Sequence, residues 1–138
     1  MKTNPVIVYD TNIVISGIIF GGNPRRCIEF AQKGKVTLLT SPTLLFELST
    51  KLKTKFHWSN REIQEVIEGI SFFARIVRPR VKITLITNDK SDNAILECAK
   101  EGNADYILSG DKKHLLNLIS FEEIPILTPK DFLDIYYD

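Results

Sequence analysis

Short apolar runs alternate with helical patterns along the whole chain, and this alternation constrains the fold more than any other feature. Five runs are predicted to be strands: Val6–Tyr9, Val36–Thr40, Val81–Ile86, "ADYILSGD" at 104–111 and "IPILT" at 124–128. Strands that alternate with helices form a parallel sheet with helices on both faces. We therefore expect a single domain over residues 1–138, with three α/β/α layers and a central, mostly parallel sheet of about five strands.

The helices between these runs are predicted from their caps and their periodicity. Ser59 and Glu62 form a capping box, which opens a helix that we expect to run to about Ile76. The other expected helices are Thr11–Phe20, Pro24 to near Gly34, one starting at Ser41 and Pro42, Ser91 to about Glu101, and Pro129 to about Tyr136.

The composition excludes several classes of protein. The hydrophobic content is 43% and the formal net charge is +1, which are ordinary values for a globular chain. The apolar runs are too short to span a bilayer, so we expect no membrane segment. Cys27 and Cys98 lack CxxC spacing, and Met1–Pro5 is polar rather than part of a leader peptide. We therefore expect reduced thiols, no zinc site and a cytoplasmic location.

Acidic residues stand where the first and fourth strands end. Asp10 follows Val6–Tyr9 directly, and Asp111 follows Ser109 and Gly110. In parallel sheets, ligands bind outside the carboxyl ends of the strands. Each of these aspartates is also explained as the N-cap of the helix that follows it. For Asp10 alone, the cap is the better explanation.

Two further acids lie on predicted helices. Asp92 precedes Ile95, Leu96 and Ala99 on one apolar stripe, so its carboxylate is expected to point toward the sheet. Glu47 lies beside the apolar stripe of its helix, and an exposed ion pair with Lys51 at i+4 explains it equally well.

The topology can bring these four acids to one edge of the sheet. Two carboxylates 4 Å apart repel by about 4 kcal/mol at an effective dielectric constant near 20, so a grouped set favours a bound cation. Oxygen ligands without nearby His or Cys favour Mg²⁺ or Mn²⁺. Such ions complete their shells with phosphate oxygens, and phosphodiester hydrolysis is the chemistry most natural to the site.

Four motifs together resemble the PIN-domain family, in its branch of VapC-like toxins of toxin–antitoxin systems. They are "VYDTNIVISGI", an acid in the helix after the second strand, "DNAILECA" and "ADYILSGDKKHLL". The resemblance covers nearly the whole chain and implies a Rossmann-like α/β/α fold. It also implies a Mg²⁺- or Mn²⁺-dependent endoribonuclease, an RNA substrate, a cognate antitoxin protein and a homodimer.

Carried over by position, the resemblance makes Asp10, Glu47, Asp92 and Asp111 the catalytic and metal-binding set. Asn12 and Ser109 match the supporting polar residues of the family. Relatives often carry another acid at the position of Lys113, so this departure puts a fifth carboxylate in doubt, and Asp89 is a candidate to supply one from its loop.

Basic residues near these acids are candidates for contacts with RNA phosphates, and a solvated helix surface explains them equally well. They are Arg25, Arg26, Lys112 and Lys113. Two other functions stay open. "DTN" after a first strand also resembles haloacid-dehalogenase-type phosphatases, although Asn12 stands where their second aspartate is expected. A non-catalytic PIN-like module that binds RNA or a protein is the second alternative.

Overall fold

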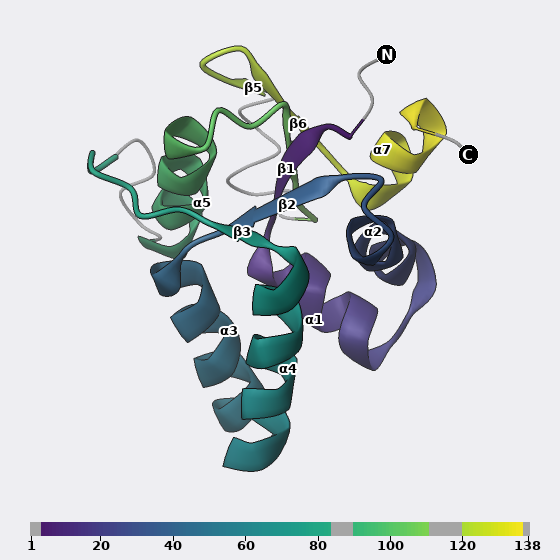
Figure 1. Cartoon of the computed structure of the whole chain (residues 1–138), viewed down its shortest axis with the longest axis vertical. Coiled ribbons are helices and arrows are strands. Elements are labelled where there is room, and N and C mark those ends of the chain that lie inside the picture. The colour runs from purple at the N-terminus through teal and green to yellow at the C-terminus, as the bar shows by residue number, and fades with distance from the viewer. Residues whose placement is uncertain (1–3, 84–89, 111–119, 137–138) are drawn as a thin grey trace.

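The computed structural model describes residues 4–83, 90–110 and 120–136, and its central feature is a sheet with strand order β3-β2-β1-β4-β6-β5 (Figure 1). All neighbouring strands are parallel except β5 and β6, which are antiparallel. The strands are β1 (Val6–Tyr9), β2 (Thr37–Thr40), β3 (Arg75–Ile76), β4 (Tyr106–Leu108), β5 (Ser120–Phe121) and β6 (Ile124–Leu127). The predicted mostly parallel α/β architecture is confirmed.

Successive residues of the central strands face opposite sides of the sheet, and each side has its own core. Ile7, Tyr9 and Leu38 belong to one core, which also contains residues of α1, α2, α3, α4 and α7. Val8 and Leu39 belong to the other core, which α5 covers. Because both faces are buried, these strands are continuously apolar, as fully covered parallel strands are. The three layers that the sequence predicts are thus present.

The helices begin close to the predicted caps. The described helices are α1 (Thr11–Ile19), α2 (Gly22–Gln32), α3 (Pro42–Thr54), α4 (Asn60–Phe73), α5 (Lys90–Glu101) and α7 (Pro129–Ile135). Ser59 and Glu62 form the predicted capping box, with the Glu62 N–H 3.1 Å from Ser59 Oγ and the Ser59 N–H 2.9 Å from Glu62 Oε1.

The region of the predicted third strand differs from the prediction in the part that the structure describes. Helix α4 ends at Phe73 rather than near Ile76, and β3 follows at once, pairing with β2. Of the predicted strand 81–86, residues 81–83 are irregular and the rest lie outside the described residues. The Ile83 N–H donates to Glu97 Oε2 at 2.8 Å, so residues 81–83 contact α5 and are not part of a strand.

Strand β5 is a second difference, because no strand was predicted between Asp111 and Ile124. It forms a hairpin with β6 through Glu122 and Glu123, whose φ angles are 46° and 69°. Left-handed residues at both turn positions suit the twist of a two-residue hairpin, but Asn, Asp and Gly are the usual occupants. Two glutamates therefore gave no turn signal.

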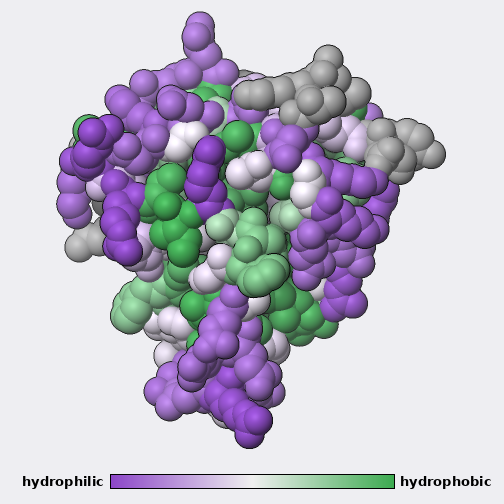
Figure 2. Space-filling model, in the orientation of Figure 1, coloured by the Kyte–Doolittle hydropathy of each residue, from purple (hydrophilic) through white to green (hydrophobic). Residues whose placement is uncertain are grey.

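The surface of the described part of the chain is mixed in character. In Figure 2, hydrophilic residues cover the C-terminal end of α3 and the N-terminal end of α4, at the bottom of the view. Hydrophobic residues gather nearer the centre of the same face. Phe72 of α4 is 93% exposed. Within the described ranges, every helix is too short or too polar to cross a membrane.

Candidate active site

Asp10 and Ser109 lie side by side at the carboxyl edge of the sheet because of the strand register. Tyr9 pairs with Leu108, and the Asp10 N–H donates to the Leu108 carbonyl at 2.8 Å. Ser109 is anchored in turn by its N–H, which donates to the Leu127 carbonyl at 2.9 Å. The next residues of β1 and β4 are therefore neighbours, and both are buried.

Among the described residues, two groups donate hydrogen bonds to the Asp10 carboxylate. The Asn12 N–H donates to Oδ1 at 3.1 Å, which makes Asp10 the N-cap of α1, and the Ser109 hydroxyl donates to Oδ2 at 3.0 Å. Burial nevertheless raises the pKa of Asp10 above its ordinary value, against the lowering effects of these donors and of the Lys51 charge. The Glu47 charge raises this pKa further. The predicted cap is confirmed, and it accounts for one carboxylate oxygen.

Glu47 is held near Asp10 by α3, which Ser41 caps and which packs against both α1 and α5. Leu44, Leu48 and Leu52 bury one side of this helix, and Glu47 lies beside that stripe. Its Oε1 is 3.5 Å from Lys51 Nζ, so the i, i+4 pair exists, but the side chains are only 15% and 22% exposed. Within the described residues, the buried Glu47 Oε2 has no hydrogen-bond partner.

Of the two remaining acids, the structure places only Asp92. It lies in the first turn of α5 and is 4% exposed, as its position on the apolar stripe predicts. Helix α5 contacts β1, β2 and β4. Asp111, along with Asp89, lies outside the described residues.

The donor set suits a hard cation, although the described residues do not complete a metal site. No group of three or more His, Cys, Asp or Glu side chains in the described ranges lies close enough together to hold a metal ion. The oxygens that are present come from carboxylates, a hydroxyl and an amide, and one of them, Glu47 Oε2, is buried with no partner in the described part of the chain. Oxygen donors of this kind suit Mg²⁺ or Mn²⁺.

A PIN domain family model matches residues 6–113 of this chain. The match spans most of the 138 residues and contains all four predicted acids. The chain belongs to the PIN domain family. The predicted family is confirmed, and the match favours it over the phosphatase alternative.

A solved structure also resembles this PIN domain. It is described as VapBC2 from Rickettsia felis bound to a DNA fragment from their promoter. The TM-score is 0.63 at 17% sequence identity, and the match covers 88% of this chain and 96% of the other. At this identity the likeness supports the fold alone. A search among curated proteins found no match.

The predicted phosphate contacts differ in their surroundings. Arg25 donates from Nε to the Gly17 carbonyl at 2.8 Å and from a terminal nitrogen to the Ile18 carbonyl at 2.9 Å. These carbonyls lie at the end of α1 opposite Asp10, so the geometry favours a structural role for Arg25. Arg26 is exposed, and Lys112 and Lys113 lie outside the described residues.

Lys51 is the site residue that sequence reasoning did not assign. Its Nζ lies 3.2 Å from Asn12 Oδ1 as well as 3.5 Å from Glu47, so it joins α3 to the start of α1. The available signal was a basic residue one turn after a candidate acid. Taken alone, that spacing predicts only a surface pair.

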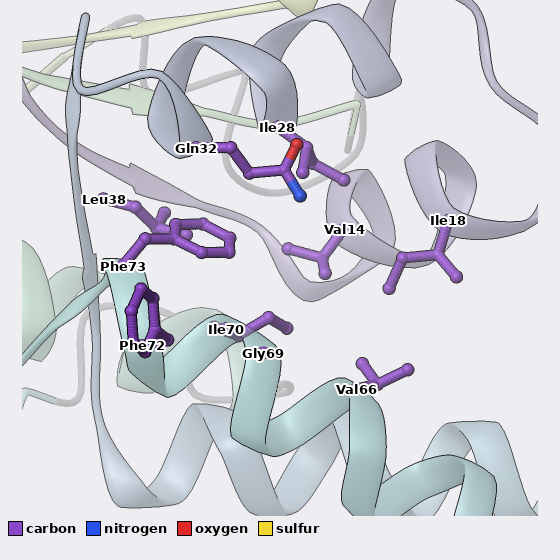
Figure 3. Close-up of a pocket in the computed structure, with 10 residues that line it drawn as sticks. All are labelled: Val14, Ile18, Ile28, Gln32, Leu38, Val66, Gly69, Ile70, Phe72 and Phe73. Carbon is purple, nitrogen blue, oxygen red and sulfur yellow. The ribbon is translucent and has the colours of Figure 1, made fainter.

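This PIN domain also has an apolar groove with a volume of about 540 Å³. Figure 3 shows Val14 of α1, Ile28 of α2, and Ile70 and Phe73 of α4 lining it, with Gln32 as a polar neighbour. Asp10, Glu47 and Asp92 do not line the groove.

Proposed function

We propose that this PIN domain is a metal-dependent endoribonuclease that acts in the cytoplasm as the toxin of a type II toxin–antitoxin pair. The observation that carries the nuclease proposal is the buried Glu47 Oε2, which has no hydrogen-bond partner among the described residues and lies close to the buried carboxylate of Asp10. Such an arrangement is costly for the metal-free protein and becomes favourable when a cation binds. The family match supports the same reaction class.

In this proposal, Asp10, Glu47, Asp92 and Asp111 hold Mg²⁺ or Mn²⁺. When bound, the ion supplies a water of lowered pKa and offsets charge on the phosphate. The Ser109 hydroxyl fixes the orientation of Asp10 through Oδ2, and the Asn12 N–H fixes it through Oδ1. Both contacts keep the carboxylate in place before the ion arrives, which is the task of groups that support metal ligands.

The toxin part of the proposal rests on the resemblance and on the fold shared with VapBC2. Its natural inhibitor would be a cognate antitoxin protein, and the apolar groove is a surface that a protein partner can cover. We also propose a homodimer, as the resemblance implies. A non-catalytic module that binds RNA without cutting it is the alternative.

Cleavage of a labelled single-stranded RNA by the purified protein tests the proposal. We expect cleavage with Mn²⁺ or Mg²⁺ and none with EDTA. Asp10→Asn and Glu47→Gln should each lower the rate by more than about 100-fold, which exceeds the usual effect of a residue that only orients a ligand. Expressed in a bacterial host, the wild type should arrest growth and Asp10→Asn should not.

Glu65→Gln is the matched control, because it removes the same charge from an exposed side chain of α4. This variant should cleave at the wild-type rate. Metal-independent RNA binding without cleavage would identify the non-catalytic module. Equal cleavage by the wild type and Asp10→Asn would overturn the assignment of Asp10.

A further inference from the structure

Lys51 places a positive charge between two segments of the candidate site. Its Nζ contacts Asn12 Oδ1 at 3.2 Å and Glu47 Oε1 at 3.5 Å. Asn12 and Lys51 are 39 positions apart, so this contact depends on how α3 packs against α1. An ordinary surface pair within one helix has no such third partner.

The position of Lys51 is that of a counter-ion for the acids. Within the described residues, its charge is the one that opposes the repulsion between Asp10 and Glu47. Its side chain is 22% exposed, so it is partly removed from the screening effect of water. Lys51 thus supplies part of the charge compensation that a divalent cation would supply.

A divalent cation and this ammonium group compete for the same carboxylate. Glu47 Oε1 faces Lys51, whereas Glu47 Oε2 is buried and has no partner in the described residues. A cation bound through Glu47 would lie close to Lys51 Nζ, and two positive charges at such a distance repel strongly. Lysine has a flexible four-carbon stem, so the ammonium can move away from the carboxylate.

We propose that Lys51 is a built-in counter-ion that stabilises the metal-free site and weakens its affinity for divalent cations. This inference rests on the proposed function, because it requires that Asp10 and Glu47 bind a metal. When a divalent cation binds to the site, it then replaces the Lys51 ammonium group as the partner of Glu47. The protein releases its metal more readily than the same carboxylates would without Lys51.

Calorimetric titration of the purified protein with Mn²⁺ tests this inference without measuring RNA cleavage. Lys51→Met keeps much of the apolar stem and removes the charge, so it should bind Mn²⁺ about tenfold more tightly, which corresponds to about 1.4 kcal/mol. Lys51→Arg keeps the charge and should bind Mn²⁺ within about threefold of the wild type, a change of less than half that free energy. In EDTA, Lys51→Met should melt at a lower temperature than the wild type.

Lys53→Met is the matched control, since Lys53 lies on the same helix and is exposed. It changes the net charge equally, and its Mn²⁺ affinity should stay at the wild-type value. Equal Mn²⁺ affinities for Lys51→Met and Lys53→Met, with tight binding by both, would overturn the role of Lys51 and leave the proposed function standing. Absence of Mn²⁺ binding in every protein would overturn both.

Discussion

The two edges of the central sheet each hold a buried or half-buried aspartate next to a strand, and the two aspartates have opposite surroundings. At the amino edge, Asp105 and Val6 form a reciprocal pair. The Val6 N–H donates to Asp105 Oδ2 at 2.7 Å, and the Asp105 N–H donates to the Val6 carbonyl at 2.6 Å. Asp105 therefore joins the start of β4 to the start of β1.

Aromatic packing stabilises the same end of the molecule. Tyr106, which follows Asp105, meets Phe132 edge-to-face with ring centroids 6.0 Å apart. Phe132 stacks on Tyr136 with centroids 4.9 Å apart. The first contact joins β4 to α7, and the second extends the packing from Phe132 to Tyr136. The contacts at the amino edge are therefore structural.

At the carboxyl edge, by contrast, burial and the Glu47 charge both disfavour the ionised form of Asp10. Glu47 has a buried oxygen without a partner in the described residues. The comparison teaches that an acid at a strand end is not informative by itself. What marks Asp10 as a candidate ligand is its burial beside a second acid, because burial and the Glu47 charge both raise its pKa.

Removing a donor from the carboxyl edge should have the largest effect. Ser109→Ala deletes the hydroxyl that donates to Asp10 Oδ2, so the carboxylate loses part of its fixed orientation. We expect metal-dependent RNA cleavage to fall by about 10- to 100-fold, as it does when partners of metal ligands are lost. Single-turnover cleavage at saturating Mn²⁺ measures this.

Ser49→Ala is the control, because it removes a hydroxyl that donates to the Phe46 carbonyl on α3, and it should cleave normally. Normal cleavage by Ser109→Ala would show that the hydroxyl does not orient Asp10.

Removing the acceptor from the amino edge should affect stability and leave cleavage unchanged. Asp105→Ala leaves the Val6 N–H without its partner, which should lower the free energy of unfolding by about 1 to 3 kcal/mol. Urea unfolding measures this. Asp105→Asn keeps an acceptor oxygen and should lose less. If Asp105→Ala were as stable as the wild type, the two edges would not differ in the way proposed here.

The sequence predicts most of the fold because caps and periodicity are local signals. The bounds of β1 and the capping box at Ser59 match the structure. The apolar run at 81–86 has strand character, but the Ile83 N–H donates to Glu97 of α5, 14 positions later, rather than to a strand. A contact with a residue on a distant helix cannot be predicted from a local sequence pattern.

The sequence predicts that the residues of the candidate site share one edge of the sheet, but it does not predict their contacts. Parallel topology places Asp10 and Ser109 at the same end of the sheet, but their hydrogen bond depends on the pairing of Tyr9 with Leu108. The link from Lys51 to Asn12 depends on helix packing, which sequence spacing does not reveal. The position of Asp111 in the site stays a prediction.

The last and smallest effect is a pH dependence of stability that Asp10 gives to the carboxyl edge of the metal-free protein. Burial raises the pKa of Asp10 in the folded state by more than its two hydrogen-bond donors and the Lys51 charge lower it, so the folded protein holds this proton more tightly than the unfolded chain does. The contribution of Asp10 to stability is therefore greatest below its unfolded pKa of about 4. It declines as the pH rises toward the folded pKa and is constant above it.

Asp10→Asn has no such decline, and Asn also caps helices well and can still interact with the Asn12 N–H and the Ser109 hydroxyl. The stability of this variant relative to the wild type should thus increase from pH 4 upward and then level off. Urea unfolding of both proteins in EDTA over this range measures the difference. Asp134→Asn, which changes an exposed acid of α7, should show no such rise. A difference between Asp10→Asn and the wild type that does not change with pH would mean that ionised Asp10 is as well stabilised in the folded protein as in water, and burial at the carboxyl edge would then not disfavour its charge.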